Sequence, residues 1–121
     1  MKTKLLMMAV VMVSGAAMAD DKFALKGDAA KGAEKFATLC VSCHGEKGDG
    51  NGVAAAALTP KPTNFADPAN AARLTDEYVY KVIKDGGAAN GRSPMMVAWS
   101  GTLKDDELRN VAAYVLKFKK K

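Results

Sequence analysis

The sequence predicts an all-α fold, and three observations support this class. Apolar residues recur at helical spacing in three separate segments, near residues 28–40, 75–85 and 105–119. Stretches rich in glycine and proline lie between these segments and favour loops. No segment shows the apolar–polar alternation of a strand. We therefore expect three main helices joined by long loops.

The first helix is expected from about Asp28 to Cys40. Asp28 is a good N-cap residue, because its side chain can accept hydrogen bonds from the first turn. Ala33, Phe36, Ala37 and Cys40 follow the spacing i, i+3, i+4, i+7 and lie on one helix face. The end of this helix therefore positions the first of the two cysteines in the chain.

The segment that follows is expected to be irregular. Residues 45–52 contain four glycines in eight positions, which predicts tight turns and excludes a stable helix. Residues 53–58 are expected to form a short helical turn. Pro60, Pro62 and Pro68 then favour extended or turn geometry.

Two more helices are expected in the second half of the chain. Thr75 is a plausible N-cap for a helix from Tyr78 to Asp85, which Gly86-Gly87 would end. A loop over residues 88–101 follows. The last helix is expected to begin near Asp105 and to run to about Lys119, and its apolar face consists of Leu108, Val111, Ala112 and Val115.

The first nineteen residues have the pattern of a cleaved secretory signal peptide. Lys2 and Lys4 precede an apolar run over residues 5–13, and Ala17-Met18-Ala19 forms a cleavage site. The run is shorter than the roughly 20 apolar residues that span a bilayer. We therefore predict an exported protein with one domain at residues 20–121 and no membrane-spanning segment after cleavage.

The charge balance narrows the class of partner. The full chain carries a net charge of +5; without Lys2 and Lys4, 16 basic and 13 acidic residues remain, a net charge of +3. No basic stripe with interleaved aromatic residues is present, so the sequence does not favour nucleic-acid binding. The positive charge is compatible with docking to an acidic protein surface.

Cys40-Val41-Ser42-Cys43-His44 is a C-x-x-C-H pentapeptide, the pattern of c-type haem attachment. The two thiols can each add to a vinyl group of one haem, and the histidine then lies next to the iron as an axial ligand. A zinc site needs about four ligands, whereas the chain has two cysteines and one histidine. A thioredoxin-like dithiol needs a βαβ context. The motif predicts one covalent haem c, held by Cys40 and Cys43, with His44 on the iron.

The second axial position separates an electron carrier from an enzyme. Five of the seven methionines lie in the predicted signal peptide, which leaves Met95 and Met96 as candidate thioether ligands. A thioether favours ferrous iron and raises the reduction potential. A closed six-coordinate iron suits electron transfer, whereas an open or labile position suits a haem enzyme or a gas sensor.

On these residues the chain resembles the class I c-type cytochromes, in particular the small soluble monohaem proteins of the bacterial periplasm. The resemblance covers nearly all of residues 20–121. It includes an amphipathic helix with Gly32 and Phe36 before the motif, and an aliphatic-x-x-Tyr pattern from Val111 to Tyr114 in the last helix. It implies a cytochrome c fold around one haem, with Gly32 packed against the Val111–Tyr114 face.

The same resemblance bears on the axial ligands. The family segment Met-x-x-aromatic-x-x-x-Leu matches residues 96–103, which implies that Met96 rather than Met95 binds the iron. The usual proline after this methionine is replaced by Val97. The family also implies that a proline carbonyl, from Pro60 or Pro62, accepts the other ring N–H of the ligating histidine. In the same way Trp99 either packs in the haem pocket or donates its indole N–H to a propionate.

The function that the resemblance implies is electron transport without catalysis. The protein is expected to be a monomeric periplasmic carrier that shuttles one electron between a redox protein donor and a redox protein acceptor. Two alternatives stay open. One is a haem enzyme or gas sensor with an open or labile sixth ligand, and the other is a cytochrome subunit of a permanent oxidase or reductase complex.

Overall fold

The computed structural model describes residues 23–120, and every regular element in this part of the chain is helical. The α-helices are α1 (Ala29–Leu39), α2 (Val41–His44), α3 (Asp76–Asp85) and α4 (Asp105–Leu116). Three 3-10 turns lie in the connections: η1 (Ala55–Ala57), η2 (Pro68–Asn70) and η3 (Ala88–Asn90). The predicted all-α class is confirmed, with the single turn of α2 added to the three main helices. The predicted signal peptide lies outside the described residues.

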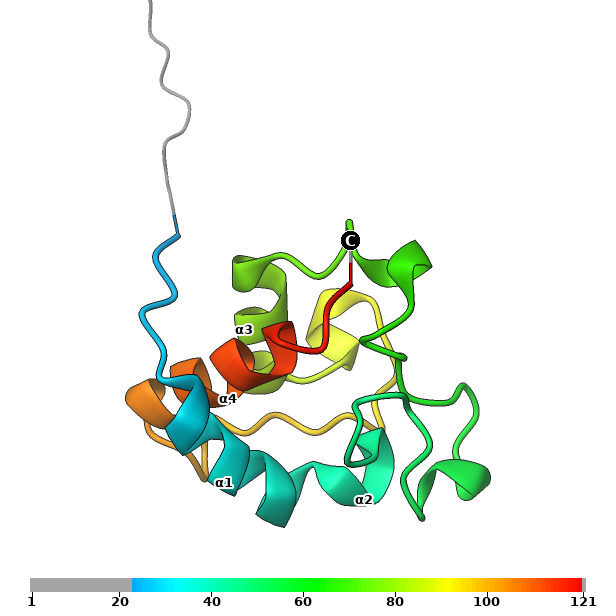
Figure 1. Ribbon diagram of the computed structural model, residues 1–121. Coiled ribbons are helices and arrows are strands. Elements are labelled where there is room, and N and C mark those ends of the chain that lie inside the picture. Colours follow the sequence, from blue (N-terminus) through cyan, green and yellow to red (C-terminus); the bar gives the residue numbers. More distant parts are fainter. Residues whose placement is uncertain (1–22, 121) are drawn as a thin grey trace, which may run out of the picture.

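Helix α4 lies between α1 and α3 and packs against both (Figure 1). Its apolar face explains this central position, since Leu108, Val111, Ala112 and Val115 are all buried. The core continues through Phe36 on α1 and through Val79 and Ile83 on α3. No helix among residues 23–120 is both long enough and apolar enough to cross a bilayer.

The predicted N-caps are present at α1 and α3. The Asp28 carboxylate accepts hydrogen bonds from the backbone N–H groups of Ala30 and Lys31, at 2.9 and 3.3 Å. The Thr75 hydroxyl accepts one from the backbone N–H of Tyr78, at 3.2 Å. Each cap satisfies a backbone donor that the first helical turn leaves unpaired. Helix α3 begins at Asp76, two residues before the predicted start.

Helix α4 ends earlier than predicted, at Leu116 instead of Lys119. The next residues form tighter turns, in which the N–H groups of Lys117 and Phe118 bond to carbonyls three residues back, both at 3.0 Å. This turn brings the Phe118 ring to 5.6 Å from the ring of Phe36. Contacts of the aromatic side chain with the core thus outweigh one further turn of helix.

The crossing of α1 and α4 depends on glycine. A Cβ atom added at Gly32 would lie 1.9 Å from the carbonyl oxygen of Asn110 and 2.9 Å from the backbone nitrogen of Val111. Such distances are far below van der Waals contact, so only glycine allows the two backbones to approach this closely. The predicted close crossing is therefore present, centred on Asn110 and Val111.

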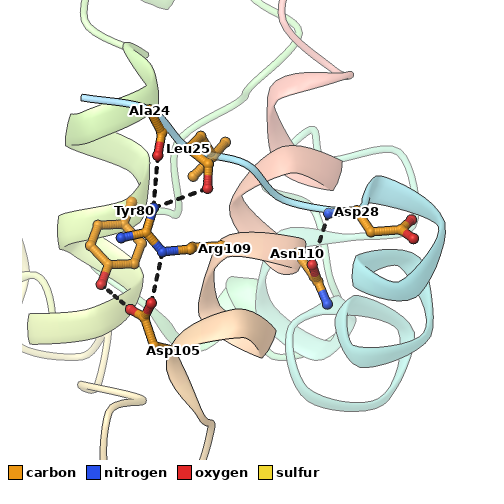
Figure 2. A network of polar contacts seen from close by, with 7 residues as sticks. All are labelled: Ala24, Leu25, Asp28, Tyr80, Asp105, Arg109 and Asn110. Atoms are coloured by element: carbon orange, nitrogen blue, oxygen red, sulfur yellow. Dashed lines mark hydrogen bonds and ion pairs between the residues drawn. The ribbon is translucent and has the colours of Figure 1, made fainter. Parts of the chain in front are cut away.

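A polar network holds the segment before α1 against the other helices (Figure 2). The Arg109 guanidinium donates to the carbonyls of Ala24 and Leu25, at 2.8 and 3.0 Å, and to the Asp105 carboxylate at 2.7 Å. It lies 4.8 Å from the centre of the Tyr80 ring, whose hydroxyl donates to Asp105. One arginine thus joins the N-terminal segment to α3 and α4.

Candidate haem site

The C-x-x-C-H pentapeptide forms the short helical turn that follows α1. Cys40 is both the C-cap of α1 and the N-cap of α2. The backbone N–H groups of Cys43 and His44 bond to the Cys40 carbonyl at 3.3 and 2.9 Å. Residues three and four apart lie on one side of a helical turn, so the two thiols and the imidazole face the same side. All three side chains line one cavity.

This cavity has a volume of about 570 Å³, within the range of about 300–1,000 Å³ for cofactor pockets. It is bounded by the end of α1, by α2, by the loop over residues 58–74, by α3 and by the loop over residues 92–99. Its walls are mainly apolar, and the apolar side chains include Leu39, Leu58, Phe65, Leu74, Val79, Val82, Ile83, Trp99 and Val115. The indole of Trp99 packs against the core.

Both candidate methionines reach the cavity from the loop after α3, but their burial differs. Met95 is 62 % exposed, whereas Met96 is half-buried and packs against the core. Backbone hydrogen bonds hold this loop on α3, with the Gly87 N–H donating to the Met96 carbonyl at 2.8 Å and the Trp99 N–H to the Ile83 carbonyl at 2.9 Å. The predicted site residues Cys40, Cys43, His44 and Met96 therefore line the same cavity.

The glycine-rich loop supports the motif directly, a role that the sequence analysis missed. The N–H of Gly50 donates to the His44 carbonyl at 2.9 Å, and the N–H of Gly52 donates to the Cys43 carbonyl at 3.1 Å. Gly50 has a φ of 81°, which a residue with a side chain rarely adopts. The run of glycines directly after the motif indicated this role, because a loop that turns back tightly onto the motif needs glycine.

The imidazole of His44 is held by an aromatic neighbour. Its ring stacks on Phe65, with 5.0 Å between ring centres and 21° between planes. Burial lowers the pKa of His44, which favours the neutral imidazole that binds metals. Its buried Nδ1 has no hydrogen-bond partner. The expected bond to the carbonyl of Pro60 or Pro62 is therefore absent from this structure, and ring stacking orients the histidine instead.

The cysteines do not resemble a redox dithiol. Both are free, and the pKa of the Cys40 thiol is raised to about 11, first by burial and then by the neighbouring Cys43. A reactive Cys-x-x-Cys pair shows the opposite, a lowered pKa that stabilises the thiolate. The described residues also contain no group of three His, Cys, Asp or Glu side chains able to hold a bare metal ion. Two thiols, a neutral imidazole and a thioether around an apolar cavity fit a covalently bound haem.

Comparison with known proteins identifies the family. Residues 27–115 match the protein family described as cytochrome c oxidase, cbb3-type, subunit III. The chain belongs to this cytochrome c family. Cytochrome c-554(548) of Halomonas halodenitrificans is 31 % identical over 88 residues, which cover 73 % of this chain and 93 % of that protein. The cbb3-type cytochrome c oxidase subunit FixP of a Bradyrhizobium strain is 36 % identical over 89 residues, or 73 % of this chain but only 27 % of FixP.

Solved structures lead to the same fold. The KustC0563 c-type cytochrome aligns with a TM-score of 0.59 and 26 % identity, over 74 % of this chain and 98 % of the other. Cytochrome c6 from the diatom Phaeodactylum tricornutum aligns with a TM-score of 0.54 and 26 % identity, over 75 % and 93 % of the two chains. The predicted cytochrome c fold is confirmed, and the family implies covalently bound haem c and a part in electron transfer.

Proposed function

We propose that this cytochrome is a periplasmic electron carrier with one haem c, which passes single electrons between larger redox proteins and catalyses no reaction of its own. Cys40 and Cys43 hold the porphyrin, and His44 and Met96 are the axial ligands. Export is supported by the signal-peptide pattern of residues 1–19.

The observation that carries the proposal is the meeting of Met96 with His44 at one cavity. These two residues come from distant parts of the chain, and no other methionine of the described residues is both at the cavity and half-buried. Met95 also lines the cavity, but it is 62 % exposed. A soft, neutral thioether opposite a histidine is the ligand pair of a cytochrome c electron carrier.

Haem iron supplies a one-electron couple when it is bound. The chain contributes two ligand side chains and the walls of the cavity. Burial lowers the pKa of His44, which favours the neutral imidazole that can act as a ligand, while the Met96 thioether would favour the reduced state. The mainly apolar walls provide a surface against which a porphyrin would pack. If His44 and Met96 both bound the iron, no iron position would be left for a substrate, as a carrier requires.

The axial assignment is tested by Met96→Ala and Met95→Ala compared side by side. We expect Met96→Ala to lose the weak far-red absorption band that oxidised cytochromes with a methionine–iron bond display. The reduced variant should also bind carbon monoxide readily, because one axial position becomes open. Met95→Ala should retain the band and exclude carbon monoxide. The reverse pattern would assign Met95 as the ligand.

The wild-type protein also distinguishes a carrier from a haem enzyme or gas sensor, because only the latter two leave an iron position open to carbon monoxide. Prompt binding of carbon monoxide by the reduced wild-type protein, without a far-red band in its oxidised form, would show an open site and contradict the proposed carrier.

A second candidate function is a cytochrome subunit of a permanent oxidase complex. The family description and the match to FixP favour it. The high coverage of cytochrome c-554(548), 93 % of that protein, favours a small independent cytochrome. Purification from native cells decides between them: recovery with an oxidase under mild conditions supports the subunit, and recovery as a lone monomer supports the carrier.

A further inference from the structure

The charged residues on the cavity wall are all of one sign. Lys61, Arg73 and Arg92 line it, and no aspartate or glutamate does. Basic side chains around a mainly apolar cavity create a positive potential there. The chain itself leaves this potential without a carboxylate at the cavity, so an anionic group on a ligand would be stabilised there.

Arg73 differs from the other two basic residues in its burial and its bonding. It is half-buried, and its Nη2 donates to the Thr63 hydroxyl at 3.2 Å. Its Nε is buried and has no hydrogen-bond partner. None of the ion pairs within residues 23–120 includes Arg73. A buried N–H of a charged guanidinium is costly to leave without a hydrogen-bond acceptor, and an anionic acceptor compensates best.

Arg92 and Lys61 do not have this deficit. Both side chains belong to exposed residues at the cavity, where water solvates the charge. The Arg92 Nε is also satisfied, because it donates to the Tyr78 hydroxyl at 2.9 Å. Of the three basic residues that line the cavity, Arg73 is therefore the one with a buried N–H group that lacks a hydrogen-bond acceptor.

We propose that Arg73 binds a propionate carboxylate of the haem, and that Thr63 positions the guanidinium for this contact. Haem carries two propionates, and an arginine presents planar N–H donors that match a carboxylate in a forked pair. The inference rests on haem occupancy of the cavity, as in the proposed function, but it does not depend on the identity of the sixth ligand. A free anion such as phosphate would share the chemistry, and the experiment below separates the two sources.

The test uses holoprotein with ¹³C-labelled haem propionates and records infrared difference spectra between the oxidised and reduced states. We expect Arg73→Gln to shift the labelled carboxylate bands relative to wild type. Thr63→Val, which keeps the shape of the side chain and removes the acceptor, should shift them in the same direction by less. Arg92→Gln removes an equal charge from the same cavity and should leave the bands in place.

Two results would overturn the proposal. Labelled bands at wild-type positions in Arg73→Gln would show that the propionates do not contact this residue, and any bound anion would then be a free one. Equal shifts in Arg73→Gln and Arg92→Gln would report only the total charge of the cavity. If Arg73→Gln yields too little holoprotein, Arg73→Lys takes its place: a single ammonium cannot form the forked pair, so unshifted bands in that variant also overturn the proposal.

The far-red methionine band is recorded on the same samples. Its absence from the wild-type protein would contradict the His44 and Met96 ligand pair, whereas the comparison of labelled bands would remain valid. Failure of the two proposals is therefore distinguishable.

Discussion

The α1–α4 crossing and the haem cavity are built on opposite principles. At the crossing, Gly32 lets two backbones touch, and Phe36, Val111 and Ala112 are at most 2 % exposed. Around the cavity, the walls come from helix α3, the end of α1, the short turn of α2 and two loops, which surround about 570 Å³ instead of filling it. One region is completed by the side chains of the chain itself. The other has apolar walls and an unpaired Arg73 nitrogen that a bound group could complete.

The contrast shows that a chain of this size buries one part of its interior by its own side chains and leaves another part for a cofactor. Small domains bury a limited fraction of their surface, and here part of the interior surface is reserved for a cofactor. The helix crossing holds the termini of the described domain together, since Arg109 and Asn110 of α4 also bond to the segment before α1. The cavity side depends on loops such as residues 45–52, which fold back on the motif through backbone hydrogen bonds.

The largest effect is expected from loss of covalent haem. Cys40→Ala combined with Cys43→Ala should abolish a cooperative thermal transition. Without covalent haem, the apolar walls of the cavity have no porphyrin to bury their surface against. Near-ultraviolet circular dichroism during heating measures this. Ser42→Ala, which alters the same turn without removing a thiol, is the control and should unfold cooperatively. A native-like transition in the double variant would mean that the cavity region holds itself together.

The next effect probes the crossing. Gly32→Ala should destabilise the holoprotein by about 3 kcal/mol, because the added Cβ would force α1 and α4 apart. Gly101→Ala is the matched control: an added Cβ there meets nothing within 4 Å, so its stability should be unchanged or higher by about 0.5 kcal/mol. Urea unfolding gives both values. Equal stabilities of the two variants would show that α1 and α4 can move apart without loss of stability, so that close backbone contact is not what holds this region together.

The smallest effect concerns acid stability at the N-terminal segment. The hydrogen bond from Tyr80, followed by that from Arg109, lowers the pKa of Asp105 below its unfolded value of about 3.9. The stabilising contribution is therefore fully present above that unfolded value and is lost as the pH falls through the folded pKa. Because Asp105 is exposed, solvent screening keeps the contribution small.

Asp105→Asn should accordingly lower the urea midpoint at neutral pH and converge with wild type in strong acid. Asp106→Asn is the control, since the Asp106 side chain makes no hydrogen bond or ion pair with residues 23–120. A constant difference between Asp105→Asn and wild type at every pH would exclude the ionised carboxylate as the cause and would leave packing of the segment as the explanation.

Features encoded within a few neighbouring residues were predictable from the sequence. Asp28 and Thr75 cap their helices, and Gly86 ends α3, because caps depend on side chains one turn away. The predicted attachment motif is equally local, since Cys40, Cys43 and His44 lie within one helical turn, and its role in holding haem stays a prediction. The periodic apolar face of α4 also predicted its central burial.

Tertiary structure decided what depends on distant partners. The family segment over residues 96–103 already favoured Met96 over Met95, but how deeply each methionine is buried depends on how the loop after α3 docks. The early end of α4 accompanies the packing of the Phe118 ring against Phe36. Arg73 is an ordinary loop residue in the sequence, and only the fold buries its Nε without a hydrogen-bond partner. The sequence by itself determined the local motif that predicts haem attachment; the packing of remote segments decided what surrounds this motif, because burial is a property of the whole chain.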